Sequence, residues 1–335
     1  QIITSADTAD ERRAGQAIVW RTSDLLQKSS PQPITSLQGF HRAEVTSIAV
    51  SPDGTQVATG ARDGRVAFWS ATDGRLLAGG QIHAKNTIVS HLHWVNDDDV
   101  LSAGFDGRLL IATADTAEDA PARTASAAAT SSQSVASFRV RVNFPHDRIP
   151  IERVSCAPDG NRFVTVSVRT ERAQKTTSYE LQIWNPDAPQ RGRLVTPATV
   201  QQRPPQRIAA VHWSADGQRL AAVVDGRLQV FSTETWRVQK VLAAPGVGIS
   251  DAVFAPRTLP GLNRAGQHAA NPPDVIATFD GTAAHLWNLD NNTHLADFRP
   301  LLAVQATALS DDPEHPLLLT GDRAVRVFQA DSSST

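Results

Sequence analysis

The chain has 335 residues, of which 41% are hydrophobic and 20% are charged, and this composition is ordinary for a globular protein. A net charge of −2 provides no overall attraction to nucleic acid or acidic membranes, and no apolar run approaches the roughly 18 residues that a membrane-spanning helix needs. The only cysteine, Cys156, excludes an intrachain disulfide and favours a reducing compartment such as the cytoplasm. Methionine is absent even at position 1, so we expect the sequence to be part of a larger chain or complex.

Short strands separated by tight turns are predicted from the first residues onward. The opening segment holds two candidate strands, residues 1–6 and 17–20. The clearest unit follows at residues 45–69, where three runs rich in β-branched residues are separated by a Ser-Pro-Asp-Gly turn at 51–54 and an Arg-Asp-Gly turn at 62–64. Proline presets φ in such turns and glycine tolerates positive φ, so each turn predicts a hairpin.

The same frame returns along the chain. It is marked by an Asp-Gly turn, by a closing aromatic residue, or by both, and it recurs at residues 88–112, 151–184, 208–231, 249–287 and 304–328. The closing positions are 20, 69, 112, 184, 231, 287 and 328. A four-stranded repeat needs about 40–45 residues. The two widest intervals therefore predict inserted loops, which we assign to residues 113–134 and 257–273.

These turns and closing aromatic residues resemble the WD40 family, and the resemblance covers nearly the whole chain. It implies an all-β fold, a seven-bladed β-propeller with four-stranded antiparallel blades. Residues 1–335 would form this single domain, with the first and last blades incomplete. The opening unit lacks a first strand, and no fourth strand follows Phe328.

The resemblance also implies a hydrogen-bonded tetrad of His, Ser or Thr, Asp and the closing Trp within a blade. The matching residues are His41, Thr59, Asp63 and Trp69. A weaker set, His83, Ser102 and Asp106, lacks its Trp because Ala112 stands there. Such a set has the composition of a Ser-His-Asp triad, but buried polar groups need partners in any case, and we favour the structural role.

Other chemistry-bearing residues have plain structural interpretations. Cys156 aligns with an inward position of a first strand, which predicts core packing. His91 and His93 alternate on a strand and point to one face, but no third metal ligand is spaced near them. Asp97, Asp98 and Asp99 are expected to form a solvated acidic turn. We therefore predict no metal site, no cofactor and no catalytic residues.

The predicted function is a protein-interaction scaffold, and the alternative is a propeller enzyme or small-ligand sensor that uses the central channel. In this fold, the loops between second and third strands share a face with the loops between blades. Nucleic acid is disfavoured because base stacking would require several aromatic residues. An acidic protein or peptide partner is expected there, bound by a largely basic set: Arg12, Arg13, Arg62, Phe105, Arg169, Arg172, Lys175, Arg207 and Arg323.

Overall fold

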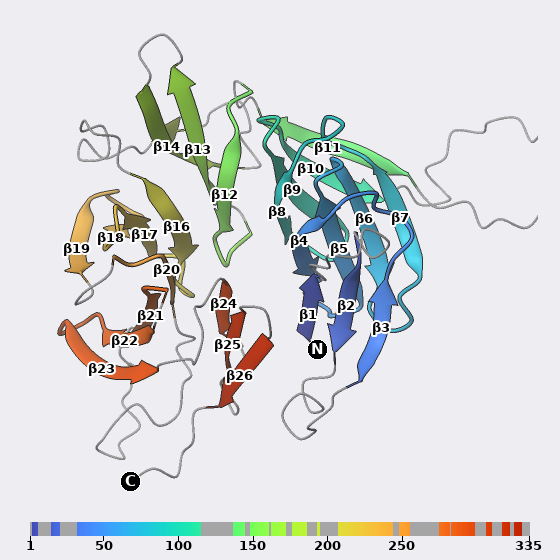
Figure 1. The fold of residues 1–335 in the computed structure, drawn as a ribbon. Coiled ribbons are helices and arrows are strands. Elements are labelled where there is room, and N and C mark those ends of the chain that lie inside the picture. The colour runs from blue at the N-terminus through green and yellow to red at the C-terminus, as the bar shows by residue number, and fades with distance from the viewer. Residues whose placement is uncertain are drawn as a thin grey trace, which may run out of the picture. The chain divides into compact units, whose positions relative to one another are not determined.

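The computed structural model describes residues 2–5, 15–20, 32–114, 137–144, 148–160, 162–171, 176–185, 193–194, 207–243, 248–254, 275–281, 283–298, 306–309, 317–321 and 325–329. Every regular element in these residues is a β-strand, so the predicted all-β class is confirmed (Figure 1). The same residues include no helix long and apolar enough to cross a membrane. The chain divides into two compact units, residues 1–154 with 167–169 and 184–192, and residues 155–166 with 170–183 and 193–335.

The first unit contains three antiparallel sheets whose strands follow one another in chain order. The first sheet has three strands, β1 (Ile2–Ser5), β2 (Ala17–Trp20) and β3 (Pro33–Leu37). The second has four strands, β4 (Val45–Val50), β5 (Gln56–Ala61), β6 (Arg65–Ser70) and β7 (Leu76–Gln81). The third also has four strands, β8 (Val89–Trp94), β9 (Asp99–Gly104), β10 (Leu109–Ala114) and β11 (Phe138–Phe144).

A fourth sheet contributes residues to both units, and three more belong to the second unit. The fourth sheet comprises β12 (Ile151–Cys156), β13 (Phe163–Glu171), β14 (Thr176–Trp184) and β15 (Arg193–Leu194). The fifth comprises β16 (Ile208–Trp213), β17 (Arg219–Val224), β18 (Arg227–Ser232) and β19 (Val238–Ala243). The last two comprise β20 (Asp251–Phe254), β21 (Val275–Phe279), β22 (Ala284–Asn288) and β23 (Thr293–Phe298), then β24 (Ala306–Leu309), β25 (Leu317–Gly321) and β26 (Val325–Gln329).

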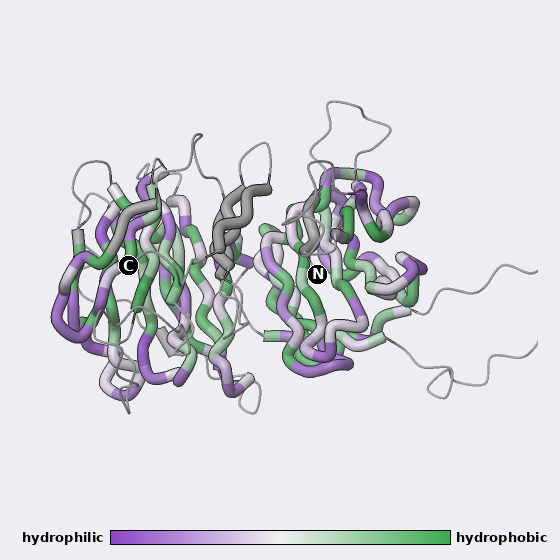
Figure 2. Tube along the Cα trace, turned by 90° about the horizontal axis from the view of Figure 1, so that it is seen from below, coloured by the Kyte–Doolittle hydropathy of each residue, from purple (hydrophilic) through white to green (hydrophobic). Residues whose placement is uncertain are grey.

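The hydrophobic core lies between successive sheets of each unit. In the first unit, Phe68 of the second sheet packs with Trp94 of the third, and Val19 of the first sheet packs in one cluster with Trp69 of the second. In the second unit, Val230 packs in one cluster with Ile276 of the next sheet. Apolar residues follow the strands and hydrophilic residues gather at many of the turns (Figure 2). The sheets that contribute to these clusters are therefore stabilised by their neighbours along the chain.

Two sequence expectations differ from the described structure. Thr113 and Ala114, expected to open an inserted loop, extend β10 and pair with Asp99 of β9 and with Phe138 of β11. Arg169, expected in a long loop, lies within β13 because the strands of this hairpin are nine residues long. Residues 115–136 and 257–273 lie outside the described residues.

Glycine at the Asp-Gly turn is required for two reasons, and they can be separated by substitution. Gly54 and Gly64 both have positive φ, 71° and 77°, but a Cβ on Gly54 meets nothing within 4 Å, whereas one on Gly64 would lie 2.1 Å from the backbone oxygen of Ala84. We expect Gly54→Ala to cost about 1 kcal/mol of left-handed strain. Gly64→Ala should cost about 3 kcal/mol or more, because backbone must move. Equal losses of thermal stability in the two variants would show that the close approach to Ala84 adds no constraint of its own.

Candidate functional site

Local hydrogen bonds explain why the Ser-x-Asp-Gly sequence turns the chain between first and second strands. The Ser51 hydroxyl donates to Asp53 Oδ1 at 2.6 Å and accepts from the Gln56 N–H at 2.9 Å. Ser214 forms the same two bonds, at 2.6 Å to Asp216 Oδ1 and at 2.9 Å from the Arg219 N–H. The turn is thus a repeated structural unit that uses its own side chains.

The structure brings together His41, Thr59, Asp63 and Trp69. Trp69 Nε1 donates to Thr59 Oγ1 at 2.7 Å, and His41 Nε2 lies 2.7 Å from the same hydroxyl. His41 Nδ1 faces Asp63 Oδ1 at 3.7 Å. Since the Thr59 oxygen already accepts from the indole, its own proton is available to His41 Nε2. We assign the His41 proton to Nδ1, which faces the Asp63 carboxylate but lies beyond hydrogen-bonding distance of it.

Two other sheets use variants of this arrangement. His83 lies 2.7 Å from Ser102 Oγ and 2.9 Å from Asp106 Oδ1, and Ala112 takes the place of the indole. In the sixth sheet Trp287 Nε1 donates to Thr278 Oγ1 at 2.9 Å. The histidine there is His285 of the third strand, 3.3 Å from Asp280 Oδ2. Sequence reasoning missed this variant because the histidine comes from the third strand of its sheet, whereas His41 and His83 lie in the connections that precede a first strand.

Burial decides between the structural and the catalytic interpretation of these sets. Thr59 is 1% exposed, and His41, Ser102 and His83 are also buried. A nucleophilic hydroxyl must reach a substrate carbonyl, and these hydroxyls have no access to one. The sets therefore hold strands together.

The carboxylates of these sets are held in the ionised form. Burial alone would raise the pKa of Asp63, but the nearby His41 imidazole and hydrogen bonds from the N–H groups of Arg42 and Arg65 outweigh it and lower the pKa to about 2. The pKa of Asp106 is lowered against the same effect of burial, through His83 and the N–H groups of Ala84 and Arg108. Each carboxylate thus accepts from the segment that enters its sheet and from its own turn.

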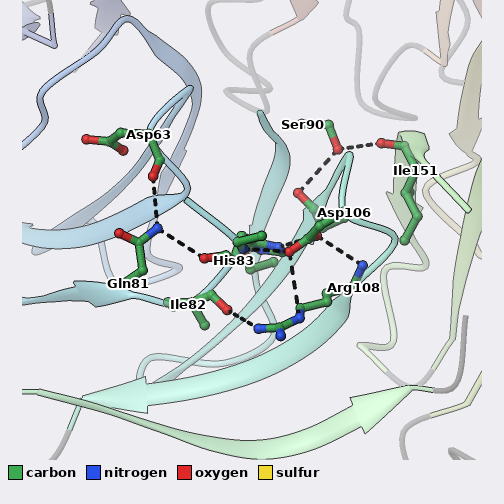
Figure 3. Close-up of polar contacts among 11 residues, drawn as sticks. Asp63, Gln81, Ile82, His83, Ser90, Asp106, Arg108 and Ile151 are labelled. Atoms are coloured by element: carbon green, nitrogen blue, oxygen red, sulfur yellow. Dashed lines mark hydrogen bonds and ion pairs between the residues drawn. The ribbon is translucent and has the colours of Figure 1, made fainter. Parts of the chain in front are cut away.

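In the first unit these bonds fasten the connection between the second and third sheets (Figure 3). Gln81 Nε2 donates to the carbonyl of Asp63 at 2.8 Å and to that of His83 at 3.0 Å. The His83 N–H donates to the Gly64 carbonyl at 3.1 Å, and Arg108 Nη1 donates to the Ile82 carbonyl at 3.1 Å. The turn of one sheet is therefore fixed to the chain entering the next.

The turns and connections fixed by these bonds form one end of the first unit, and this end carries one exposed aromatic residue and several exposed cations. Phe105 is 38% exposed. Arg62 extends into solvent and pairs with Glu44, with 2.6 Å between Nε and Oε2. Arg108 lies 3.7 Å from Asp106. The other exposed cations on the same turns and connections are Arg42, Lys85 and Arg148.

Four of the nine residues predicted to bind a partner are described. Arg62 and Phe105 stand at equivalent positions of neighbouring sheets in the first unit, each directly before an Asp-Gly turn. Arg207 is exposed in the second unit, and its N–H donates to Asp225 Oδ1 at 2.8 Å. Arg169 is half-buried in β13. The remaining residues, Arg12, Arg13, Arg172, Lys175 and Arg323, lie outside the described residues.

Bonds between sheets were not predicted. At the end of a first strand, Trp94 Nε1 donates to the Ala49 carbonyl at 3.1 Å, and Trp213 Nε1 donates to the Ser155 carbonyl at 3.0 Å. At the second residue of a first strand, the Thr46 hydroxyl donates to the Val89 carbonyl at 2.8 Å, and the Ser90 hydroxyl donates to the Ile151 carbonyl at 2.6 Å. An alignment of the first strands with one another would have shown that these two positions recur. It would not have shown which carbonyl of the neighbouring sheet each side chain reaches.

The remaining candidates from the sequence have ordinary surroundings. Among the described residues no group of three or more His, Cys, Asp or Glu side chains is placed to hold a metal ion. Burial raises the pKa of the Cys156 thiol and lowers that of His93. Asp99 differs from the expected solvated turn: it is buried, and its Oδ2 accepts from Arg141 at 2.5 Å and from Asn96 at 3.0 Å.

Comparison with known families identifies one stretch of the chain. Residues 31–70 match the family described as WD domain, G-beta repeat. This stretch is a WD40 repeat. It contains His41, Thr59, Asp63 and Trp69, so the resemblance noted from the sequence is confirmed there. Proteins with WD40 repeats are typically interaction scaffolds and usually not enzymes. No curated protein matches the chain significantly.

The Thr59 hydroxyl is the centre of the polar network in the WD40 repeat, and its removal should be costly. Thr59→Val keeps the shape of the side chain but leaves the buried His41 and Trp69 nitrogens without their partner. Each unsatisfied group costs about 1–3 kcal/mol, so we expect a total loss of about 2–5 kcal/mol. Thr35→Val is the control, because Thr35 donates only an exposed bond of 3.3 Å. Losses of equal size, measured by thermal unfolding, would exclude a central role for Thr59.

Asp63 should make stability depend on acid pH. Its pKa of about 2 lies below the ordinary value of 3.8, so its contribution is complete above about pH 4 and is lost as the pH falls from about 4 to about 2. Asp63→Asn should lower the free energy of unfolding at pH 7. It should also make that free energy fall less steeply between about pH 4 and about pH 2. The control variant is Asp98→Asn at an exposed position, and it should keep the pH dependence of stability that the wild type shows. An unchanged slope in Asp63→Asn would show that other groups set the acid sensitivity.

Proposed function

We propose that the chain is a seven-bladed β-propeller that acts as a protein-interaction scaffold. Four observations support this: repeated antiparallel meanders, cores between successive sheets, recurrent Asp-Gly turns and a WD40 repeat at residues 31–70. We also propose that residues 1–335 form a single domain and belong to a larger chain or complex. The active role of the fold is binding, not catalysis.

The observation that carries the binding proposal is that the exposed Phe105 and several exposed cations stand on the same group of turns and connections in the first unit. These turns are held by Asp63, Asp106 and Gln81, so the exposed side chains stand on a fixed backbone. A preorganised surface loses little conformational entropy on binding. Arginine and aromatic residues are the types most enriched among residues that dominate binding energy.

The partner we propose is an acidic protein segment. Arg62 is paired with Glu44 and Arg108 lies close to Asp106, but Arg42, Lys85 and Arg148 add positive charge at this end. A carboxylate of the partner could replace Glu44 on Arg62, while an apolar side chain packs on Phe105. One exposed aromatic residue is too few for nucleic-acid stacking. We also propose that a partner contacts the other residues predicted from the sequence: Arg12, Arg13, Arg169, Arg172, Lys175, Arg207 and Arg323.

The proposal predicts the effect of a double variant on binding. Acidic peptides selected from a random library by affinity for the 335-residue chain serve as probes. Arg62→Glu combined with Phe105→Ala should weaken their binding more than tenfold, because it reverses a charge and removes the apolar contact. Binding should also weaken as salt increases.

The control variant is Arg75→Glu, which makes the same charge reversal at an exposed residue of the turn between β6 and β7. It should leave the affinity unchanged, and all variants should keep the wild-type circular dichroism spectrum. Affinity that is equal in the double variant and in the wild type would move the site away from this end of the unit.

A further inference from the structure

One turn of the second unit places a tryptophan in a backbone conformation that bulky residues rarely adopt. Gly74, Trp236 and Asn292 hold the same position in the turns between third and fourth strands of the second, fifth and sixth sheets, with φ of 72°, 57° and 57°. The Gly74 N–H donates to the Ser70 carbonyl at 3.0 Å. The Trp236 N–H makes the equivalent bond to the Ser232 carbonyl at 2.8 Å. Glycine and asparagine suit this left-handed conformation, but tryptophan is strained there. Residues held in strained conformations cluster at binding sites, so the Trp236 side chain is a candidate for a binding function.

Packing fixes the ring of Trp236 but leaves part of it in solvent. The ring centroids of Trp236 and Trp213 are 6.0 Å apart, with an angle of 88° between the rings. Trp213 is buried in the core between the fourth and fifth sheets, whereas Trp236 is only half-buried against it. Trp236 Nε1 has no hydrogen-bond partner among the described residues and is not buried. The turn therefore presents a fixed aromatic surface whose indole N–H is open to solvent.

A second donor lies against the same Trp213 ring. The guanidinium carbon of Arg162 is 5.0 Å from the centroid of that ring. Arg162 Nη2 donates to Asp159 Oδ2 at 3.2 Å and to the Gly217 carbonyl at 3.3 Å, whereas Nε and Nη1 donate to no described residue. The Arg162 side chain is 34% exposed. Two donors thus stand beside one aromatic surface, and all of these residues belong to the second unit.

This combination of groups fits proline better than any other residue. Every other residue brings a backbone N–H that needs an acceptor, whereas proline has a carbonyl and no N–H. Successive prolines form a polyproline II helix, which has no internal hydrogen bonds and loses little conformational entropy when it docks on aromatic side chains. One turn of that helix rises about 9 Å, so carbonyls one turn apart suit two donors that both lie against Trp213.

The Pro-Pro sequences of the chain itself, at residues 204–205 and 272–273, are too far from this surface. The first lies within three residues of Arg207, and three residues span at most about 10 Å, whereas Arg207 and Trp213 are about 20 Å apart along β16. The second lies just before Val275 of the sixth sheet. That sheet packs on the other face of the fifth sheet from Trp213. The surface therefore suits a segment of another protein.

We propose that Trp236 and Arg162 bind a proline-rich segment of a partner protein in the polyproline II conformation. A proline ring packs on the exposed part of the Trp236 indole. One carbonyl accepts from Trp236 Nε1–H, and a carbonyl one turn away accepts from Arg162. The site shares no residue with the binding surface proposed above, so the two can be tested separately.

A fluorescein-labelled decapeptide of proline is the probe. Fluorescence anisotropy should show saturable binding of this peptide to the 335-residue chain. A decapeptide of alternating glycine and serine, which has carbonyls but neither proline rings nor polyproline II order, should not bind. Tryptophan residues labelled with a nitrogen isotope supply the second measurement. The NMR signal of Trp236 Nε1–H, assigned by its loss in Trp236→Phe, should move when the proline peptide binds.

Three variants define the contact. Trp236→Phe keeps a ring but removes the donor, and it should weaken binding about fivefold. Trp236→Asn removes the ring as well and should weaken binding more than about tenfold. It should keep the cooperative thermal transition, because asparagine suits this turn in the sixth sheet. Asn292→Gly, at the equivalent turn, is the matched control and should leave the affinity unchanged. Arg62→Glu with Phe105→Ala should also leave it unchanged.

Four outcomes would overturn the proposal. The first is an absence of saturable binding, and the second is equal binding of the glycine-serine peptide. The third is an affinity that survives Trp236→Asn or a Trp236 Nε1–H signal that does not move. The fourth is binding that appears only after Pro186 and Pro189 are replaced by alanine, because the chain would then fill the site with its own residues.

Discussion

The coupling of the second sheet to the chain that enters it depends on the buried carboxylate of Asp63 in the Asp-Gly turn. A carboxylate removed from water costs several kcal/mol unless hydrogen bonds compensate it. Asp63 obtains these bonds from the Arg42 N–H at 2.7 Å and from the Arg65 N–H at 2.9 Å, and His41 Nδ1 faces it at 3.7 Å. Its donors come from the connection that enters the sheet and from the turn itself. The charge is stable only when both are in place, so this turn couples one sheet to the path of the chain from the sheet before it.

Local features of the fold were predictable because their causes are local in sequence. The Ser-x-Asp-Gly turns satisfy their own backbone groups, and the β-branched runs around them leave no competing helical period. The residues of the polar set in the WD40 repeat could be named because the family resemblance implies them at these positions. Thr59 faces Ala67 across the β5–β6 ladder, and Trp69 stands two residues further on the same face. Such a diagonal pair follows from the period of a strand.

Most of the features that escaped prediction depend on partners far away in the chain. The indole of Trp94 reaches Ala49, 45 residues earlier, and Arg141 reaches Asp99 across 42 residues. A run of three aspartates indicates a solvated turn when it is considered alone. Only the pairing of β10 with β11 brings Arg141 to Asp99 and makes a buried carboxylate tolerable there. The histidine of the sixth sheet escaped for a different reason: it lies only five residues after Asp280, on the third strand, and not in the segment before the first strand where the other sets have theirs.

Comparison of the three polar sets shows which part of them the sheets require. The hydroxyl is present in every set, as Thr59, Ser102 or Thr278, and it is buried each time. The histidine lies on the third strand in the sixth sheet and in the connection before the first strand in the other two, and the indole is absent in the third sheet. A hydroxyl can donate and accept at once, so it can satisfy an imidazole, an indole or both with little change of volume. The hydroxyl is therefore the fixed centre of the set. The groups around it vary with the residues that each sheet has available to pair with its own carboxylate.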